Sequence, residues 1–333
     1  MDWGVLPPVK GNPMLRSTLL AGLAAILVVL MAGCISVGAF RPTHLQEVIV
    51  AESPAWFEWN RIALIDVEGY IGTESGAIFR SGVTSVADVK EKLDIATRDR
   101  RIKAVVLRVN TPGGEAAASD MIHQEIIRFR AGTGKPVVAA LMGTAASGGY
   151  YVACAADSIM AQPSTVTGSI GVIMHFANAE GLFEKIGVRS EVIKSGELKD
   201  IGSPMRGMTS EERRILQQVN NALFARFIEV VRDGRRLMTD EQIAAVSNGR
   251  IFTAAEARDL NMVDGIGYLD DAIALARALA GIQTADVVHY RVYPDYNSNI
   301  YAALAGSQLL QKGFSAVLDR SGPAFLYLWS PGD

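Results

Sequence analysis

The stretch Gly143-Thr144-Ala145-Ala146-Ser147-Gly148-Gly149-Tyr150-Tyr151 decides the fold, because it predicts a turn from a buried strand into a buried helix. Residues 136–142 before it form an apolar run that is typical of a buried strand. Small and apolar residues continue after it without a charge as far as Asp157, which favours a helix. Ser147 is therefore expected at a strand-to-helix turn that can expose its hydroxyl. A Ser-Gly-Gly run by itself is more often an ordinary turn.

Strands and helices alternate on both sides of this stretch. The pattern predicts strands at 62–67, 103–109, 136–142, 158–161 and 169–174, with helices at 86–96, 115–130 and 181–186. The run Thr111-Pro112-Gly113-Gly114 is expected to break the strand before it. Thr209 and Glu212 predict the capped start of a long helix, which is followed by helices at 239–246, 254–260 and 269–279 and a strand at 287–292. Such alternation indicates a layered α/β domain with a parallel sheet.

The N-terminal part of the chain predicts a membrane segment. The run from Ser17 to Phe40 carries no charge, and as a helix it would reach about 36 Å, enough for a hydrocarbon core. Lys10 and Arg16 before it favour a cytoplasmic N-terminus and a body outside the cytoplasm. The expected organisation is a cytoplasmic N-terminus (1–16), a transmembrane segment (17–40), a linker (41–60), a catalytic domain (61–293) and a C-terminal tail (294–333).

Met31-Ala32-Gly33-Cys34 offers an alternative, because it resembles the lipobox of bacterial lipoproteins, although Met31 departs from the usual leucine. In that case the apolar segment is a signal that is removed, and Cys34 carries lipid. Both interpretations anchor the protein to a membrane.

The composition of the chain argues against nucleic-acid binding and against metal- or histidine-based catalysis. A net charge of -3 disfavours nucleic acid as a partner. The two cysteines and four histidines show no metal-ligand spacing, so neither a metal nor a histidine-based catalytic site is expected.

A serine nucleophile without a placed histidine needs another base, and a neutral lysine can serve. The pKa of that lysine must fall by about three units, which costs about 4 kcal/mol and requires burial. Lys194 and Lys199 both lie in one short segment, and spacing alone does not select between them.

Several motifs together resemble the signal peptide peptidase A family of serine peptidases, also called protease IV or peptidase family S49. They occur in the family's order, between about Ile62 and Leu279, and are Asn110-Thr111-Pro112-Gly113-Gly114, Ala146-Ser147-Gly148-Gly149-Tyr150-Tyr151, Thr167-Gly168-Ser169-Ile170-Gly171-Val172, Ser195-Gly196-Glu197-Leu198-Lys199-Asp200, Gly202-Ser203-Pro204 and Met208-Thr209-Ser210-Glu211-Glu212. The resemblance implies a crotonase-like, ClpP-like layered α/β fold.

The resemblance also implies the roles of individual residues. Ser147 would be the nucleophile and Lys199 the general base of a Ser–Lys dyad, with Ser169 orienting the lysine. Gly114 and Gly148 are the best candidates for the oxyanion hole, because glycines permit close approach. No cofactor is implied. Thr111 stands where the family commonly has serine, and Leu198 where it commonly has tyrosine.

A chain with one copy of each motif resembles the half-length members, which assemble into rings whose active sites are shared between neighbouring subunits. The implied substrates are remnant signal peptides and other hydrophobic or unfolded peptides, at a bacterial inner membrane. Two other functions fit the fold: a catalytically silent scaffold at the membrane that regulates another protein, and an enzyme acting on acyl-CoA thioesters. The Ser–Lys pair disfavours both.

Overall fold

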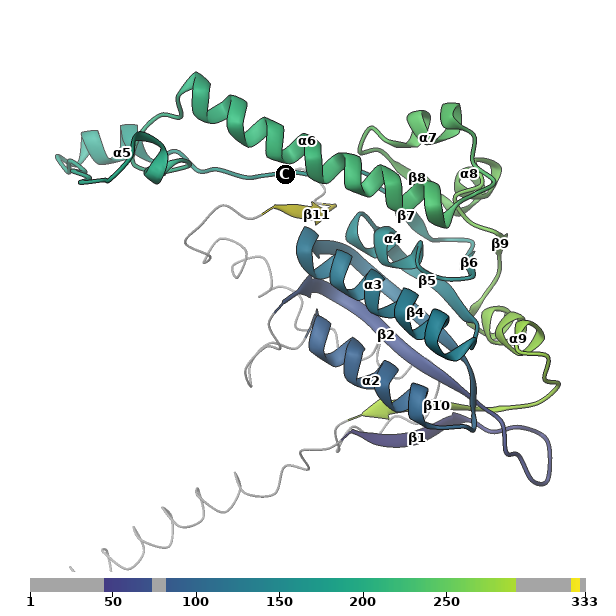
Figure 1. Ribbon diagram of the computed structural model, residues 1–333. Coiled ribbons are helices and arrows are strands. Elements are labelled where there is room, and N and C mark those ends of the chain that lie inside the picture. Colours follow the sequence, from purple (N-terminus) through teal and green to yellow (C-terminus); the bar gives the residue numbers. More distant parts are fainter. Residues whose placement is uncertain (1–44, 74–81, 292–324, 330–333) are drawn as a thin grey trace, which may run out of the picture. The chain divides into compact units, whose positions relative to one another are not determined.

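The computed structural model describes residues 45–73, 82–291 and 325–329. Among these residues, eleven strands form one sheet, whose main path is β1-β10-β2-β4-β5-β6-β9 (Figure 1). Neighbouring strands from β10 to β9 run parallel, and β3 and β7 add in parallel to β2 and β5. Strands β8 and β11 are antiparallel to β7 and β4. The predicted layered α/β fold with a mainly parallel sheet is confirmed.

The strands are β1 (Gln46–Ala51), β2 (Arg61–Gly72), β3 (Val83–Ser85), β4 (Ile102–Glu115), β5 (Val137–Ala146), β6 (Ser158–Ala161), β7 (Val166–Gly168), β8 (Ile251–Thr253), β9 (Gly265–Ile266), β10 (Asp286–Arg291) and β11 (Leu326–Leu328). The helices are α2 (Val86–Arg98), α3 (Ala116–Thr133), α4 (Gly148–Ala153), α5 (Glu180–Lys185), the 3-10 helix η1 (Glu197–Asp200), α6 (Ser210–Gly234), α7 (Asp240–Val246), α8 (Ala254–Asp259) and α9 (Leu269–Leu279).

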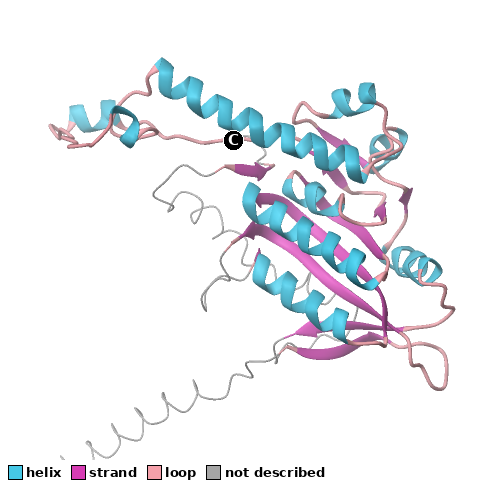
Figure 2. Ribbon diagram, in the orientation of Figure 1, coloured by secondary structure: helices cyan, strands magenta, loops and turns pink. Residues whose placement is uncertain are grey.

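The central strands are apolar on both faces because helices cover both. Ala104 and Val106 of β4 belong to a buried cluster with Leu269 and Ala272 of α9. The alternate residues of β4 face the other side of the sheet, where α2, α3 and α4 follow one another across the strands (Figure 2). Burial on both faces explains why these strands are continuous apolar runs.

Side chains cap the starts of two helices, and the cap at Thr209 was predicted from the sequence. The Ser85 hydroxyl accepts the Asp88 N–H (3.1 Å) at the start of α2. Thr209 and Glu212 form a reciprocal capping box at the start of α6, with the Thr209 N–H donating to Glu212 Oε2 (2.8 Å). The long helix expected after residue 208 therefore begins as predicted.

The strands that lead to the Ser147 turn are longer than predicted. Strand β4 continues through Gly113 and Gly114 to Glu115, because these residues pair with β2 on one side and β11 on the other. Strand β5 continues through Gly143 to Ala146. Helix α4, in contrast, ends at Ala153 instead of continuing to Asp157.

Three other predictions missed pairings that are distant in the sequence. The strand expected at 169–174 is absent: the chain pairs as β7 just before it, and of its residues Ile173 forms an isolated bridge to Leu326. The linker expected at 41–60 contains β1, and the tail expected at 294–333 contributes β11.

The predicted membrane segment, 17–40, lies outside the described residues, as does Cys34. Within the described ranges, every helix is too short or too polar to cross a membrane.

Candidate active site

Ser147 occupies a strained turn between β5 and α4. Its φ is 53° and its ψ is -115°, a conformation that costs a residue other than glycine about 1–3 kcal/mol. Backbone hydrogen bonds hold the turn on both sides, from the Ser147 N–H to the Gly168 carbonyl (2.7 Å) and from the Tyr151 N–H to the Ser147 carbonyl (2.9 Å). The Ser147 side chain is buried, and its Oγ has no hydrogen-bond partner among the described residues. A strained strand-to-helix turn of this kind typically presents a nucleophile.

Ser169 lies next to Ser147 at the end of the neighbouring strand. Ala146 of β5 pairs with Gly168 of β7, so each serine follows directly after this pair. Ser169 also has a positive φ (50°), and its N–H donates to the Arg250 carbonyl (2.8 Å). Apart from these two serines, Asn261 is the one described residue other than glycine with a positive φ. Backbone strain is therefore concentrated where the sequence predicts catalytic serines.

The glycines of β4 and α4 lie in direct contact beside this turn. A Cβ on Gly148 would lie 3.2 Å from the Gly113 Cα, and a Cβ on Gly113 would lie 2.8 Å from the Gly148 nitrogen. A Cβ on Gly114 would lie 2.0 Å from the Ile71 carbonyl oxygen, so no side chain fits there either. The structure thus brings Gly114 and Gly148 to one place. It also adds Gly113, with φ of 108°, which the sequence did not single out.

Within one chain, Lys199 forms no hydrogen bond with Ser147 among the described residues. It lies on η1 and is exposed, and Ser147 Oγ has no partner among the described residues, so the Lys199 ammonium is not within hydrogen-bond distance of it. No residue from 171 to 211 is buried. This segment, which we call the arm, includes α5 and η1 and has no core of its own. Figure 1 shows α5 beyond the first turn of α6.

Ion pairs fix the conformation of the arm around Lys199. Asp200 accepts hydrogen bonds from the Lys194 ammonium (2.7 Å) and the Arg206 guanidinium (2.8 Å). Arg206 also donates to Glu212 (3.0 Å), the residue that caps α6. The hydrogen bonds from Arg206 and Lys194 hold the pKa of the Asp200 carboxyl well below its usual range. Lys194, the other lysine considered as a base, is thus held in an ion pair with Asp200.

A buried polar cluster in the middle of β2, β4 and β10 was not predicted. Asp66 accepts from the Arg108 Nε (2.7 Å) and lies 2.6 Å from the His289 Nε2. Burial raises the pKa of Asp66, but the His289 hydrogen bond and the Arg108 charge outweigh it and hold that pKa at about 2. Burial and the Asp66 charge raise the pKa of Glu68 to about 7. Asp66 pairs in register with Arg108, which precedes Gly113 on β4, so this cluster lies within the sheet and not at the strand ends beside Ser147.

Neither of the two described buried histidines extends the site. His289 belongs to the core cluster, and burial lowers the pKa of His123 to about 4 as its ring packs on Tyr151. Across the described residues, no group of acidic, histidine or cysteine side chains is arranged to hold a metal ion.

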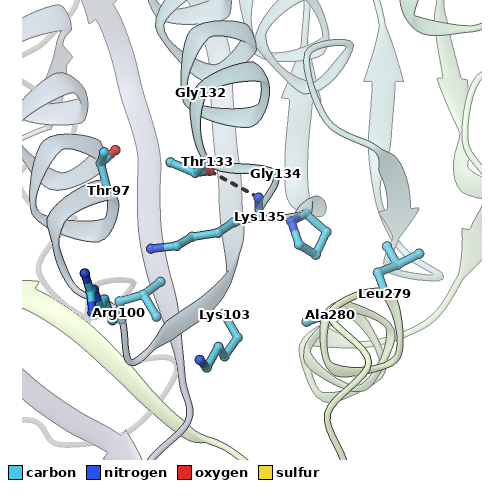
Figure 3. Close-up of a pocket in the computed structure, with 11 residues that line it drawn as sticks. Thr97, Arg100, Lys103, Gly132, Thr133, Gly134, Lys135, Leu279 and Ala280 are labelled. Carbon is cyan, nitrogen blue, oxygen red and sulfur yellow. Dashed lines mark hydrogen bonds between the residues drawn. The ribbon is translucent and has the colours of Figure 1, made fainter.

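Figure 3 shows a pocket of about 570 Å³ and the residues that line it. It lies at the opposite ends of the strands from Ser147. Its lining includes Lys103 at the start of β4 and Pro136 just before β5, whereas Ser147 follows the end of β5. Lys135 in this pocket donates to the carbonyls of Ala96 (2.6 Å) and Asp99 (2.9 Å) and so stabilises the end of α2. The pocket is therefore a space between the ends of α2, α3 and α9, and it is not part of the Ser147 site.

Comparison with known proteins points to one family. Peptidase family S49 matches residues 130–283. A Synechocystis protein named as a protease is 36% identical over 223 residues, which are 67% of this chain and 76% of that protein. Protease 4 of Salmonella typhi is 35% identical over 239 residues, which are 71% of this chain and 38% of that protein. The chloroplastic serine protease SPPA of Arabidopsis thaliana is 34% identical over 225 residues, 67% of this chain and 33% of that protein. The match thus spans well under half of these two longer relatives.

Proposed function

Because the chain belongs to peptidase family S49, to which the signal peptide peptidases and protease IV belong, we propose that it is a serine endopeptidase with a Ser147–Lys199 dyad. The observation that carries this proposal is the strained turn at Ser147, whose buried hydroxyl lies beside a cluster of glycines and has no hydrogen-bond partner in the part of the chain that the structure describes.

The proposed reaction takes place at this turn. Ser147 Oγ attacks a peptide carbonyl while a neutral Lys199 accepts its proton, and the lysine donates that proton to the leaving amine as the peptide bond breaks. Water then hydrolyses the ester formed at Ser147, with Lys199 taking the proton of the water and returning it to Ser147 Oγ. The backbone amides of Gly114 and Gly148 stabilise the oxyanion of the tetrahedral intermediate. Ser169, directly beside Ser147, orients the lysine. The reaction needs neither a metal nor an organic cofactor.

Lys199 reaches Ser147 of a neighbouring subunit in this proposal. The arm exposes large apolar side chains, among them Ile186 (61% exposed) and Ile193 (103% exposed). Exposed apolar residues gathered in one segment favour a protein partner, and a second copy of the chain is the partner that a shared site requires. Burial between subunits would also exclude water from the reacting groups. The proposed assembly is a homo-oligomeric ring.

The proposed substrates are remnant signal peptides and other hydrophobic or unfolded peptides at a bacterial inner membrane. The segment 17–40 would anchor the chain there, as a single transmembrane helix or through lipidated Cys34. The backbone edges of β4 and Ile173, with which β11 pairs in the structure, suit an extended peptide, because a peptide backbone can pair with them in the same way.

The test is cleavage of hydrophobic peptides by the full chain purified in detergent. Ser147→Ala and Lys199→Ala should each abolish cleavage and leave the fold intact, since both side chains act in the chemical step. Lys194→Ala should matter far less, because Arg206 still holds Asp200. Near-wild-type cleavage by Lys199→Ala would refute the dyad. A wild-type chain that forms rings but cleaves nothing would favour the silent scaffold.

A further inference from the structure

Strand β11, close to the C-terminal end of the chain, lies in a groove between two other segments. On one side its residues pair antiparallel with β4, where the Ala116 N–H donates to the Phe325 carbonyl (3.1 Å) and the Trp329 N–H donates to the Pro112 carbonyl (2.8 Å). On the other side Leu326 and Ile173 exchange two hydrogen bonds of 3.1 Å. Both edges of this short segment are therefore paired with backbone, as in a peptide bound by strand addition.

Tyr327 anchors the segment. Its side chain is 1% exposed, and its ring lies 5.0 Å from that of Tyr151 and 4.7 Å from that of Phe227, centroid to centroid. Its hydroxyl donates to the Leu223 carbonyl (2.9 Å) of α6. Figure 1 shows β11 alongside this helix. A buried aromatic ring with a satisfied hydroxyl is a strong and specific contact.

The backbone of Tyr327 lies against the predicted oxyanion glycines. Tyr327 pairs in register with Gly114. Its carbonyl oxygen lies 3.1 Å from the position that a Cβ would take on Gly148, and it would overlap a Cβ on Gly113. The two following residues, Leu328 and Trp329, line a cavity of about 380 Å³ together with Ser169 and Phe224. The segment 325–329 thus lies over the region between Gly114, Gly148 and Ser169.

We propose that residues 325–329, which we call the strap, occupy the groove in which a substrate peptide binds, so that a substrate must displace them. This proposal rests on the peptidase function proposed above and deepens it in two ways. The strap lowers activity until it is released. The Tyr327 pocket also selects substrates with an aromatic side chain at the position that lies over Gly114.

The test measures whether the strap protects the groove, and it needs no catalysis. In full chains carrying Ser147→Ala, hydrogen exchange is followed at the Ala116 and Ile173 amides, which donate to the strap. Adding Tyr327→Ala should speed exchange at both amides at least tenfold, because the anchor is lost. Tyr327→Phe should stay close to the parent chain, because the ring contacts remain. Tyr268→Ala is the matched control, since Tyr268 is 57% exposed.

A synthetic peptide with the sequence Pro-Ala-Phe-Leu-Tyr-Leu-Trp-Ser-Pro, that of residues 323–331, should restore protection to the Tyr327→Ala chain. The same peptide with alanine for tyrosine should not. Unchanged exchange in Tyr327→Ala, or equal rescue by the two peptides, would overturn the proposal.

Activity measurements then separate the strap from the peptidase. In chains with Ser147 intact, Tyr327→Ala should lower the KM for a short aromatic peptide several-fold with little change in kcat. An unchanged KM would show that the strap does not compete with substrate. Exchange results as predicted in a chain that cleaves no peptide would support the strap and refute the peptidase.

Discussion

Replacing Gly148 by alanine tests the oxyanion assignment most sharply. The added Cβ would lie 2.5 Å from the Ser119 Oγ, 3.1 Å from the Tyr327 carbonyl oxygen and 3.2 Å from the Gly113 Cα. The first distance is too short, so the Ser119 hydroxyl or the start of α4 must shift. Overpacking of this kind costs about 1–3 kcal/mol of stability. A displaced oxyanion donor costs a further factor of about 10²–10³ in kcat.

Two companion variants separate these effects. Gly132→Ala is the control, because a Cβ there meets nothing within 4 Å and the position lies in α3. Adding Ser119→Ala to Gly148→Ala removes the shortest contact, so it should recover part of the lost melting temperature. It should recover little of kcat, because the contact with Gly113 remains.

The assay pairs thermal unfolding with kcat for a short peptide. If Gly148→Ala lowers the melting temperature but keeps kcat within threefold of the wild type, the Gly148 amide is not an oxyanion donor.

Three further predictions concern the core, the arm and the anchor. The pKa of Glu68 is raised to about 7 in the folded chain, so its contribution to stability is complete below pH ~4.5 and falls as the pH rises towards 7. The free energy of unfolding in urea, measured for Glu68→Gln minus that for the wild type, should therefore increase over this pH range, by at most about 3 kcal/mol. A difference that does not change with pH would contradict the raised pKa. Arg206→Met should lower kcat with little change in the KM of a short peptide, because the ion pair with Arg206 holds Asp200, the residue next to Lys199. An unchanged kcat would show that this ion pair does not position Lys199. The intact mass of the membrane-extracted chain should show residues 1–40 retained, and an N-terminus at lipidated Cys34 would rule out the spanning helix.

The local parts of the site could be predicted from the sequence. Ser147 follows an apolar strand and precedes an uncharged helix, and both signals lie within a few residues of it. The capping box of Thr209 and Glu212 is local in the same way. These predictions succeeded because strand and helix patterns and caps are read from neighbouring residues.

The parts that escaped prediction depend on residues far apart in the chain. The hydrogen bond between Asp66 and His289 spans 223 positions, and that from Tyr327 to Leu223 spans 104. No local pattern in the sequence shows that the segment containing Tyr327 pairs with β4. Ser169 was expected within a strand, whereas the pairing of β7 with β5 and β8 ends at Gly168 and leaves Ser169 in a strained turn.

Complementation between two inactive chains tests the shared dyad most directly. Chains with Ser147→Ala and chains with Lys199→Ala are each expected to be inactive, and they are mixed under conditions that allow subunits to exchange. A mixed ring contains interfaces at which an intact Ser147 meets an intact Lys199 of its neighbour, so peptide cleavage should partly return. Rings carrying both substitutions in every chain should stay inactive. If mixed rings are shown to form by mass and no cleavage returns, the dyad is not built between subunits.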